Sequence, residues 1–356
     1  MGHSILAFIV VLGVLIFFHE LGHFLAARFF KVGVETFSLG FGPKIYRFRK
    51  GLTEYCLSLI PLGGYVKMVG EDPGVPVRES DKEISFDHKK LYQKMLIVAA
   101  GPLFNFLLAI LIFYVIFQIS GLYIIKPVVG SVGENSPAMK AGIQEGDEIK
   151  AINNVSVDSW DDMVNIISSG TGEPVEILIS RNYETFGVEL LPEAKKVKNI
   201  FGETIDRYMI GISASGDMVQ IPLNPCQAFY EGCRKTWEIV ELTILSVVKM
   251  ISGAVSSENM GGPIMIAQMA GEQAEAGMAN FAFFIAMLSI NLGIINLFPV
   301  PVLDGGHLLF FSIEAVRGRA ASHKFREKSN QFGMALLVAL MVFVFYNDII
   351  RIVKGG

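Results

Sequence analysis

The sequence predicts a polytopic α-helical membrane protein with about four transmembrane helices, a membrane-associated β-hairpin and one inserted α+β domain. The composition supports this class: 52% of the 356 residues are hydrophobic and only 18% are charged, and the mean hydropathy is +0.48. Average soluble domains carry roughly 25% charged residues. The formal net charge of -4 excludes a basic nucleic-acid binder, so we expect no nucleic-acid partner.

Four segments are apolar enough to cross a bilayer, which takes about 20 helical residues. They cover residues 5–30, 95–119, 281–297 and 332–350. A shorter apolar stretch, residues 308–313, predicts a buried helix between the last two spans. No Lys or Arg precedes the first segment, so we expect a permanent span rather than a removable signal peptide.

Basic residues predict the orientation of the spans, because short cytoplasmic loops carry an excess of Lys and Arg. They gather after the first span, before the second, and between the third and fourth: Lys31, Lys44, Arg47, Arg49, Lys50, Lys89, Lys90, Lys94, Arg317, Arg319, Lys324, Arg326 and Lys328. Both loops are therefore expected in the cytoplasm. Both termini and the long segment between the second and third spans are expected outside.

The patterns divide the chain into four regions. Residues 1–119 contain the first two spans, and residues 279–356 contain the last two. Between them, residues 120–222 predict one small domain outside the cytoplasm, and residues 223–278 predict an amphipathic helix over 226–255 with a linker. That helix carries about six charges, so we expect it to lie on the membrane or on the protein rather than to cross.

Local patterns predict the elements inside these regions. In the first cytoplasmic loop, Tyr55, Leu57 and Leu59 alternate before Pro61 and a Gly-Gly pair, which predicts a β-hairpin over residues 53–68. This hairpin could serve packing alone. In the small domain, the predicted strands cover 128–132, 148–152, 175–179 and 186–191, and the predicted helices cover 137–141 and 160–168.

The first span contains the motif H-E-x-x-H at residues 19–23. Residues i and i+4 share one face of a helix, so the imidazoles of His19 and His23 can reach one metal ion. Glu20 falls beside them and can take a proton from a water that the metal activates. The alternative is a pair of surface histidines on an ordinary helix. Ionisable side chains inside a span are costly and functional by default, which favours the metal site.

A catalytic zinc site takes three protein ligands and keeps one position open. Asp304 is the preferred third ligand, because it is an acid at the end of another apolar span. Pro299, Pro301 and a Gly-Gly pair break the helix around it, and broken backbone at membrane depth is tolerated where it lines a site. Asp304 could also cap the following helix. His307 is a lower-ranked alternative ligand.

The second and third predicted spans contain three asparagines, and an unpaired amide is costly there. Asn291 or Asn296, in the third span, could bond the substrate backbone or a developing oxyanion, or only a neighbouring helix. Asn105 lies four residues after Gly101 in the second span. We interpret Asn105 as a helix–helix contact, with Gly101 allowing close approach.

Three motifs together resemble the site-2 protease family, and most of all its bacterial regulator-of-sigma-E group. They are HELGH at 19–23, GPLFN at 101–105 and NLGIINLFPVPVLDGGHLLFF at 291–311. The likeness covers nearly the whole chain, in the same order and topology. It implies an intramembrane zinc metalloprotease with Zn2+ as its cofactor.

The resemblance implies roles by position. His19, His23 and Asp304 match the zinc ligands, and Glu20 matches the catalytic base. The implied substrate-binding residues are Asn296, Pro299 and Pro301 along a cleft, and Gly63 and Gly64 in a membrane-associated β-element that pairs with the unwound substrate as an added strand. Strand addition makes physical sense, because a helical substrate must unwind before water can attack its carbonyls.

Residues 125–215 resemble a PDZ domain through the stretch SPAMKAGIQEGDEIKAINN. The run RYMIGIS at 207–213 resembles the strand placed first in other PDZ domains, in a permuted order. Many members of the group carry two such domains, but we find one. Its groove is expected to bind a peptide or a C-terminus, or to gate access to the site.

The family resemblance implies a bacterial inner-membrane enzyme, embedded in the lipid bilayer, with its PDZ domain on the periplasmic or extracellular side. Its implied task is the second cut of regulated intramembrane proteolysis, on single-span membrane proteins of the anti-sigma-factor type or on signal-peptide remnants. A protease of the CAAX-processing type, and a zinc-binding receptor or transporter, are the rival readings. Glu20 discriminates against the second rival, because a transport site needs no general base.

Overall fold

The computed structural model describes residues 2–71, 77–199, 201–255 and 261–353. The chain forms two compact units. The helical unit contains residues 1–115, 229–247 and 256–356, and the β-rich unit contains residues 116–228 and 248–255.

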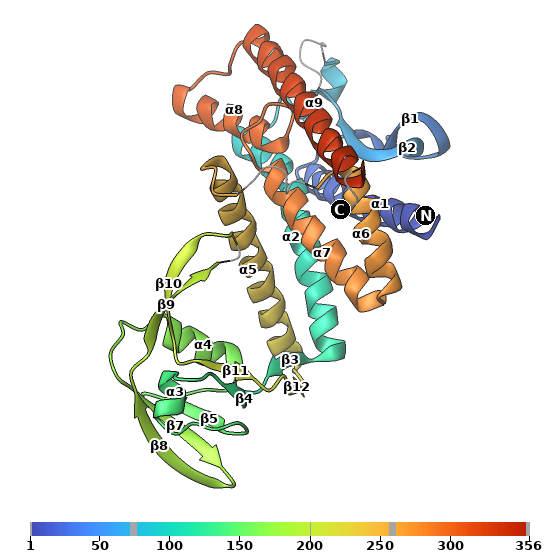
Figure 1. The fold of residues 1–356 in the computed structure, drawn as a ribbon. Helices are drawn as coiled ribbons and strands as arrows, with labels where there is room; N and C mark the ends of the chain where they lie inside the picture. Colours follow the sequence, from blue (N-terminus) through green and yellow to red (C-terminus); the bar gives the residue numbers. More distant parts are fainter. Residues whose placement is uncertain (1, 72–76, 200, 256–260, 354–356) are drawn as a thin grey trace. The chain divides into compact units, whose positions relative to one another are not determined.

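Four long helices dominate the helical unit (Figure 1): α1 (Gly2–Phe29), α2 (Leu91–Ser120), α7 (Met278–Asn296) and α9 (His323–Val353). Each contains a stretch long and apolar enough to cross a membrane, and within the described ranges these four are the only such helices. They correspond to the four predicted spans, although α9 begins earlier than expected.

Small residues let α1, α2 and α7 approach one another closely. A Cβ atom on Gly22 would lie 2.3 Å from the carbonyl oxygen of Ala100, so α1 and α2 touch through their backbones. Ser289 on α7 donates a hydrogen bond of 2.8 Å to the backbone oxygen of Asn105 on α2. Such Gly and Ser contacts are typical of helix packing in membranes.

Strands β1 (Val34–Lys50) and β2 (Thr53–Met68) form an antiparallel hairpin in which both strands bend. As a result, four strand segments lie side by side, in the order 64–68, 34–41, 54–60 and 44–50. The predicted hairpin over 53–68 was therefore wrong in its extent. Residues 53–68 are one strand, the turn lies before Thr53, and β1 was not predicted. Segment 64–68 is an edge of this sheet as far as the described residues show.

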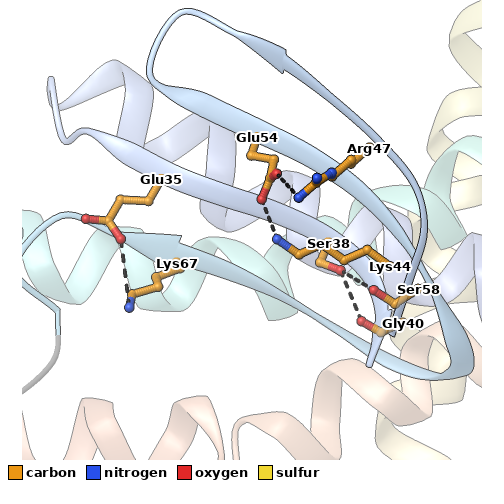
Figure 2. Close-up of polar contacts among 8 residues, drawn as sticks. All are labelled: Glu35, Ser38, Gly40, Lys44, Arg47, Glu54, Ser58 and Lys67. Carbon is orange, nitrogen blue, oxygen red and sulfur yellow. Dashed lines mark hydrogen bonds and ion pairs between the residues drawn. The ribbon is translucent and has the colours of Figure 1, made fainter. Parts of the chain in front are cut away.

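Side chains hold the bent hairpin together (Figure 2). Glu54 forms an ion pair with Lys44 and a second one, at 3.7 Å, with Arg47. The buried hydroxyl groups of Ser38 and Ser58 lie 3.1 Å apart, between neighbouring segments. These contacts fix the bend that leaves segment 64–68 at the edge.

Further helices are η1 (Glu79–Ile84), α5 (Pro225–Ile251), α6 (Pro263–Glu275) and α8 (Asp304–Arg317). Residues 229–247 of α5 belong to the helical unit. α5 is the predicted amphipathic helix, and it rests on α7, where Thr243 donates to Asn291 at 3.0 Å. α6 was not predicted. α8 extends the short buried helix expected at residues 308–313.

The β-rich unit contains three strand pairs and one larger sheet. β3 (Leu122–Ile125) pairs with β12 (Met218–Ile221), β4 (Val129–Val132) with β11 (Ile212–Ala214), and β9 (Glu193–Lys198) with β10 (Thr204–Met209). The antiparallel sheet has the order β6-β5-β7-β8, from Val155–Ser156, Glu148–Ile152, Val175–Arg181 and Glu184–Leu190. α3 (Pro137–Lys140) and α4 (Trp160–Ser168) lie at the positions predicted for them.

A separate apolar core supports this unit. Its fully buried members include Ile149, Ile152, Ile177 and Ile179, which belong to β5 and β7 at alternate or near-alternate positions. The predicted single strand over 207–213 is instead divided, because β10 ends at Met209 and β11 begins at Ile212.

Candidate metal centre

Three side chains from two distant parts of the sequence converge in the helical unit. His19 and His23 lie one turn apart on α1, and Asp304 is the first residue of α8. The two Nε2 atoms lie 3.3 Å apart, and Asp304 Oδ2 lies 3.2 Å from that of His19 and 3.5 Å from that of His23. Within the described ranges, this is the only group of three such side chains close enough to share a metal ion.

The geometry fits zinc. Zn–N and Zn–O bonds of about 2.0–2.1 Å in a tetrahedron place neighbouring ligand atoms about 3.3–3.4 Å apart, close to the three distances found here. Asp304 Oδ2 is also buried without a hydrogen-bond partner. Buried carboxylate oxygens normally have a partner, so an oxygen left free between two imidazole nitrogens fits a cation. Two imidazoles and one carboxylate leave a tetrahedral ion one open position.

The turn between α7 and α8 brings Asp304 to this place. Val302 adopts a positive φ of 90°, and a Cβ atom on Gly305 would lie 2.2 Å from the carbonyl oxygen of Phe298. Only glycine fits such a close approach. The alternative role of Asp304 as a helix cap was wrong. Leu303 occupies the N-cap position of α8, and no side chain caps this helix end.

Glu20 lies beside the three converging side chains. It is 8% exposed and lines the same cavity as they do. The hairpin reaches it directly, because a Cβ atom on Gly64 would lie 3.0 Å from Glu20 Cγ. Gly64 lies at the start of the edge segment 64–68, so the sheet edge runs up to the Glu20 side chain.

α2 contacts both imidazoles from the other side. His23 Nδ1 bonds the carbonyl oxygen of Ile97 at 2.9 Å, and His19 Nδ1 lies 3.1 Å from the side-chain amide nitrogen of Asn105. A Cβ atom on Gly101 would lie only 2.2 Å from His23 Nε2. The sequence interpretation of Asn105 and Gly101 as a helix contact missed these neighbours. Their spacing of four residues within a span was the available signal.

A cavity of about 530 Å³ surrounds the convergence. Of the remaining candidate residues, Gly64 and Asn296 line it, and so does His307, which does not join the three facing atoms. Gly63, Pro299 and Pro301 lie outside the lining, as far as the structure describes it. Asn291 instead accepts the hydrogen bond from Thr243 on α5 and is a helix contact.

Comparison with known proteins gives the family. The model of peptidase family M50 matches residues 7–340. A relative from Agrobacterium fabrum, named as a zinc metalloprotease, is 37% identical over 97% of this chain and 95% of its own. The zinc metalloprotease RasP of Geobacillus kaustophilus is 33% identical over 97% of each chain. The protease RseP of Yersinia pestis is 32% identical over 98% of this chain and 99% of its own.

Part of the chain is also similar to a solved PDZ domain of the SdrC-like protein from Listeria monocytogenes. The identity is 23%, over 24% of this chain and 84% of that one, with a TM-score of 0.20. A TM-score of this size shows no shared fold, so the PDZ assignment stays a prediction. The family match and the relatives need no such support: the chain belongs to the site-2 proteases, peptidase family M50, and is a zinc metalloprotease.

Proposed function

We propose that this protease cuts within the membrane-spanning segments of single-span membrane proteins, as the second cut of regulated intramembrane proteolysis. One observation carries the proposal. The two histidines and Glu20 lie on a helix apolar enough to cross a bilayer, together with a carboxylate and a cavity. Such polar groups are costly in a span unless they serve a function. Substrates of the anti-sigma-factor type, and signal-peptide remnants, fit this chemistry.

In this proposal, His19, His23 and Asp304 hold the zinc. Zinc bound there supplies a Lewis acid, which polarises a peptide carbonyl and makes water more acidic. Glu20 accepts the proton of the attacking water and later donates it to the leaving nitrogen of the peptide. Its burial beside the three ligands excludes bulk water from both transfers.

The substrate must present its backbone to these groups. A helical segment hides its carbonyls in internal hydrogen bonds, so it has to unwind before attack. We infer that the unwound segment pairs with residues 64–68 of β2 as an added strand, with Gly63 and Gly64 at the start of this edge. The contact between Gly64 and Glu20 brings such a strand to the base.

The α7–α8 turn forms the other side of the substrate site in this proposal. Asn296 ends α7 and lines the cavity, where its amide can bond a substrate carbonyl or the developing oxyanion. Pro299 and Pro301 follow it in the turn, where they prevent α7 from continuing as a helix. We place both prolines beside the cleft rather than in its lining.

The remaining regions keep their predicted roles as proposals. Residues 1–119 and 279–356 carry the spans, and residues 120–222 form a PDZ-like domain outside the cytoplasm that takes a peptide or a C-terminus in its groove. Residues 223–278 link the two. The basic loops support this orientation in a bacterial inner membrane.

A cleavage assay in detergent tests the proposal, with one single-span substrate in full-length form and in a form shortened outside the membrane. We expect faster cleavage of the shortened form, and loss of cleavage with a zinc chelator. Glu20→Gln should lower the rate by about 10²–10⁴-fold, because general acid–base catalysis is lost. The same variant should retain its zinc.

Two results would contradict the proposal. Unchanged cleavage by Glu20→Gln would show that Glu20 is not the general base. Equal cleavage of a soluble unfolded protein and of the membrane substrate would show that the enzyme is not specific for membrane-spanning segments.

A further inference from the structure

Three residues of α2 form a stripe against the metal centre. Ile97, Gly101 and Asn105 follow one another at intervals of four, so they lie on one face of the helix. All three are fully or almost fully buried. Through this stripe, α2 contacts Nδ1 of both imidazoles, and Gly101 leaves room for the rings between the two contacts.

The two outer contacts differ in kind. His23 Nδ1 meets a backbone carbonyl, that of Ile97, at 2.9 Å. His19 Nδ1 meets a side chain, the amide of Asn105, at 3.1 Å. Among the residues that the structure describes, no other group bonds His19 Nδ1. The orientation of the His19 ring therefore depends on a side chain that can be replaced.

The Nε2 atoms of both rings face the proposed metal position, and this determines whether Nδ1 carries a proton. A neutral imidazole that binds a metal through Nε2 carries its proton on Nδ1. That N–H needs an acceptor, and metal-bound histidines almost always have one. The carbonyl of Ile97 provides it for His23. For His19, only the oxygen of the Asn105 amide can provide it, because the nitrogen of an amide is a donor.

The Asn105 amide has an oxygen to spare. Its Oδ1 is buried and has no hydrogen-bond partner, while its nitrogen faces His19. A half-turn about the last side-chain bond exchanges the amide oxygen and the amide nitrogen, and both orientations fit the same space. The backbone oxygen of Asn105 accepts from Ser289, which fixes this turn of α2 against α7 while the amide turns.

We propose that Asn105 is a positioning residue that accepts a hydrogen bond from His19 Nδ1–H through Oδ1 and so fixes the tautomer and the orientation of this ligand. The inference rests on the proposed zinc ligands. It adds to them an acceptor that the chain supplies from a different helix, 86 residues away.

The test compares zinc affinity in purified full-length protein in detergent, by competition with a chromogenic zinc chelator. Asn105→Leu keeps the size of the side chain and removes the acceptor, so affinity should fall about 10–100-fold. Asn105→Asp restores an acceptor and should stay within a few-fold of the unchanged protein. The visible spectrum of the cobalt-substituted protein should change in Asn105→Leu and be restored in Asn105→Asp.

Two controls separate the outcomes. Asn291→Leu removes a half-buried amide contact, between α5 and α7, and should leave zinc affinity unchanged. His19→Ala should lose zinc. If His19→Ala keeps full affinity, the proposed metal centre is wrong. If His19→Ala loses zinc while Asn105→Leu does not, only the role of Asn105 is wrong.

Other outcomes also decide against the positioning role. Equal losses in Asn105→Leu and Asn105→Asp would mean that the amide serves packing and is not an acceptor. Equal losses in Asn105→Leu and Asn291→Leu would mean a general effect on helix packing.

Discussion

Each unit contains an aspartate with a buried carboxylate oxygen, and the two units treat that oxygen in opposite ways. In the β-rich unit, Asp147 is fully buried, and Arg181 bonds both of its oxygens, at 2.6 and 2.7 Å. The backbone N–H of Gln144 adds a third bond of 2.8 Å. In the helical unit, Asp304 Oδ2 is buried without a hydrogen bond, between two imidazole nitrogens.

The difference separates a structural carboxylate from the proposed metal ligand. A buried charge is stable when the protein supplies its partners, as it does for Asp147. The helical unit can do this too, because the buried carboxylate of Asp348 accepts from the N–H groups of Gly262 and Ile264, each at 2.9 Å. The helical unit therefore can supply hydrogen bonds to a buried carboxylate, and the lack of one at Asp304 Oδ2 is specific to this site.

Asp304→Asn should have the largest effect of the changes predicted here, and the effect should be on zinc binding. Zinc affinity should fall about 1,000-fold, because a ligand contributes its share of an apparent binding free energy of roughly 10–16 kcal/mol. The thermal stability of the zinc-free protein should change much less than that of Asp147→Asn, since the carboxylate faces only the two imidazoles and no arginine or backbone donor. Chelator competition and a melting curve measure the two effects. A large loss of stability without loss of zinc would make Asp304 a structural residue.

Asp147→Asn should show the reverse pattern. Removing one partner of a buried pair leaves the Arg181 charge uncompensated, so the free energy of unfolding should fall by about 3 kcal/mol. Zinc affinity should stay the same. Trp160, which packs on the core of the β-rich unit, reports unfolding by fluorescence in a Trp237→Phe background. Asp158→Asn, at an exposed position, is the matched control and should change little.

Gly101→Ala tests how closely α2 supports the proposed ligands. The added methyl group would lie 2.2 Å from His23 Nε2, so the imidazole has to move and zinc affinity should fall about 10–100-fold. Gly13→Ala on α1 is the control, because its Cβ would meet nothing within 4 Å. Equal affinity in both variants would show that the ring has more freedom than the contact indicates.

Acid should produce the smallest of these effects on the stability of the β-rich unit. Burial raises the pKa of the Asp147 carboxyl, but Arg181 and the Gln144 N–H outweigh it and hold the pKa below its ordinary value of 3.8. The stabilisation is therefore complete above about pH 4 and is lost as the pH falls through the lower folded pKa. The stability gap between the unchanged protein and Asp147→Asn, followed by Trp160 fluorescence, should be constant from pH 6 to 4 and then shrink. A gap that closes above pH 5 would contradict this.

The sequence predicted the four long apolar helices well, because long apolar runs leave few other structures open to them. It also indicated that His19 and His23 share a helix face. The convergence of Asp304, 281 residues after His23, could only be inferred from an acid beside a helix break. The distance between them depends on the turn built by Val302 and Gly305, which no local pattern defines.

The elements that were missed depend on partners far away in the chain. β1 contains Gly40, Gly42 and Pro43, which favour a loop locally, and it becomes a strand by pairing with both ends of β2. β9 is a charged run without apolar alternation, and its pairing with β10 forms the strand. The contact of Asn105 with His19 joins α2 to α1 and could not be read from either helix alone.

Zinc K-edge X-ray absorption of the purified protein tests the central claim most directly, that two imidazoles and the Asp304 carboxylate hold one zinc ion. We predict one zinc per chain, with nitrogen and oxygen ligands at about 2.0–2.1 Å and the scattering of two imidazole rings. A sulfur shell at about 2.3 Å, or an unchanged spectrum at full zinc occupancy in Asp304→Asn, would contradict the account.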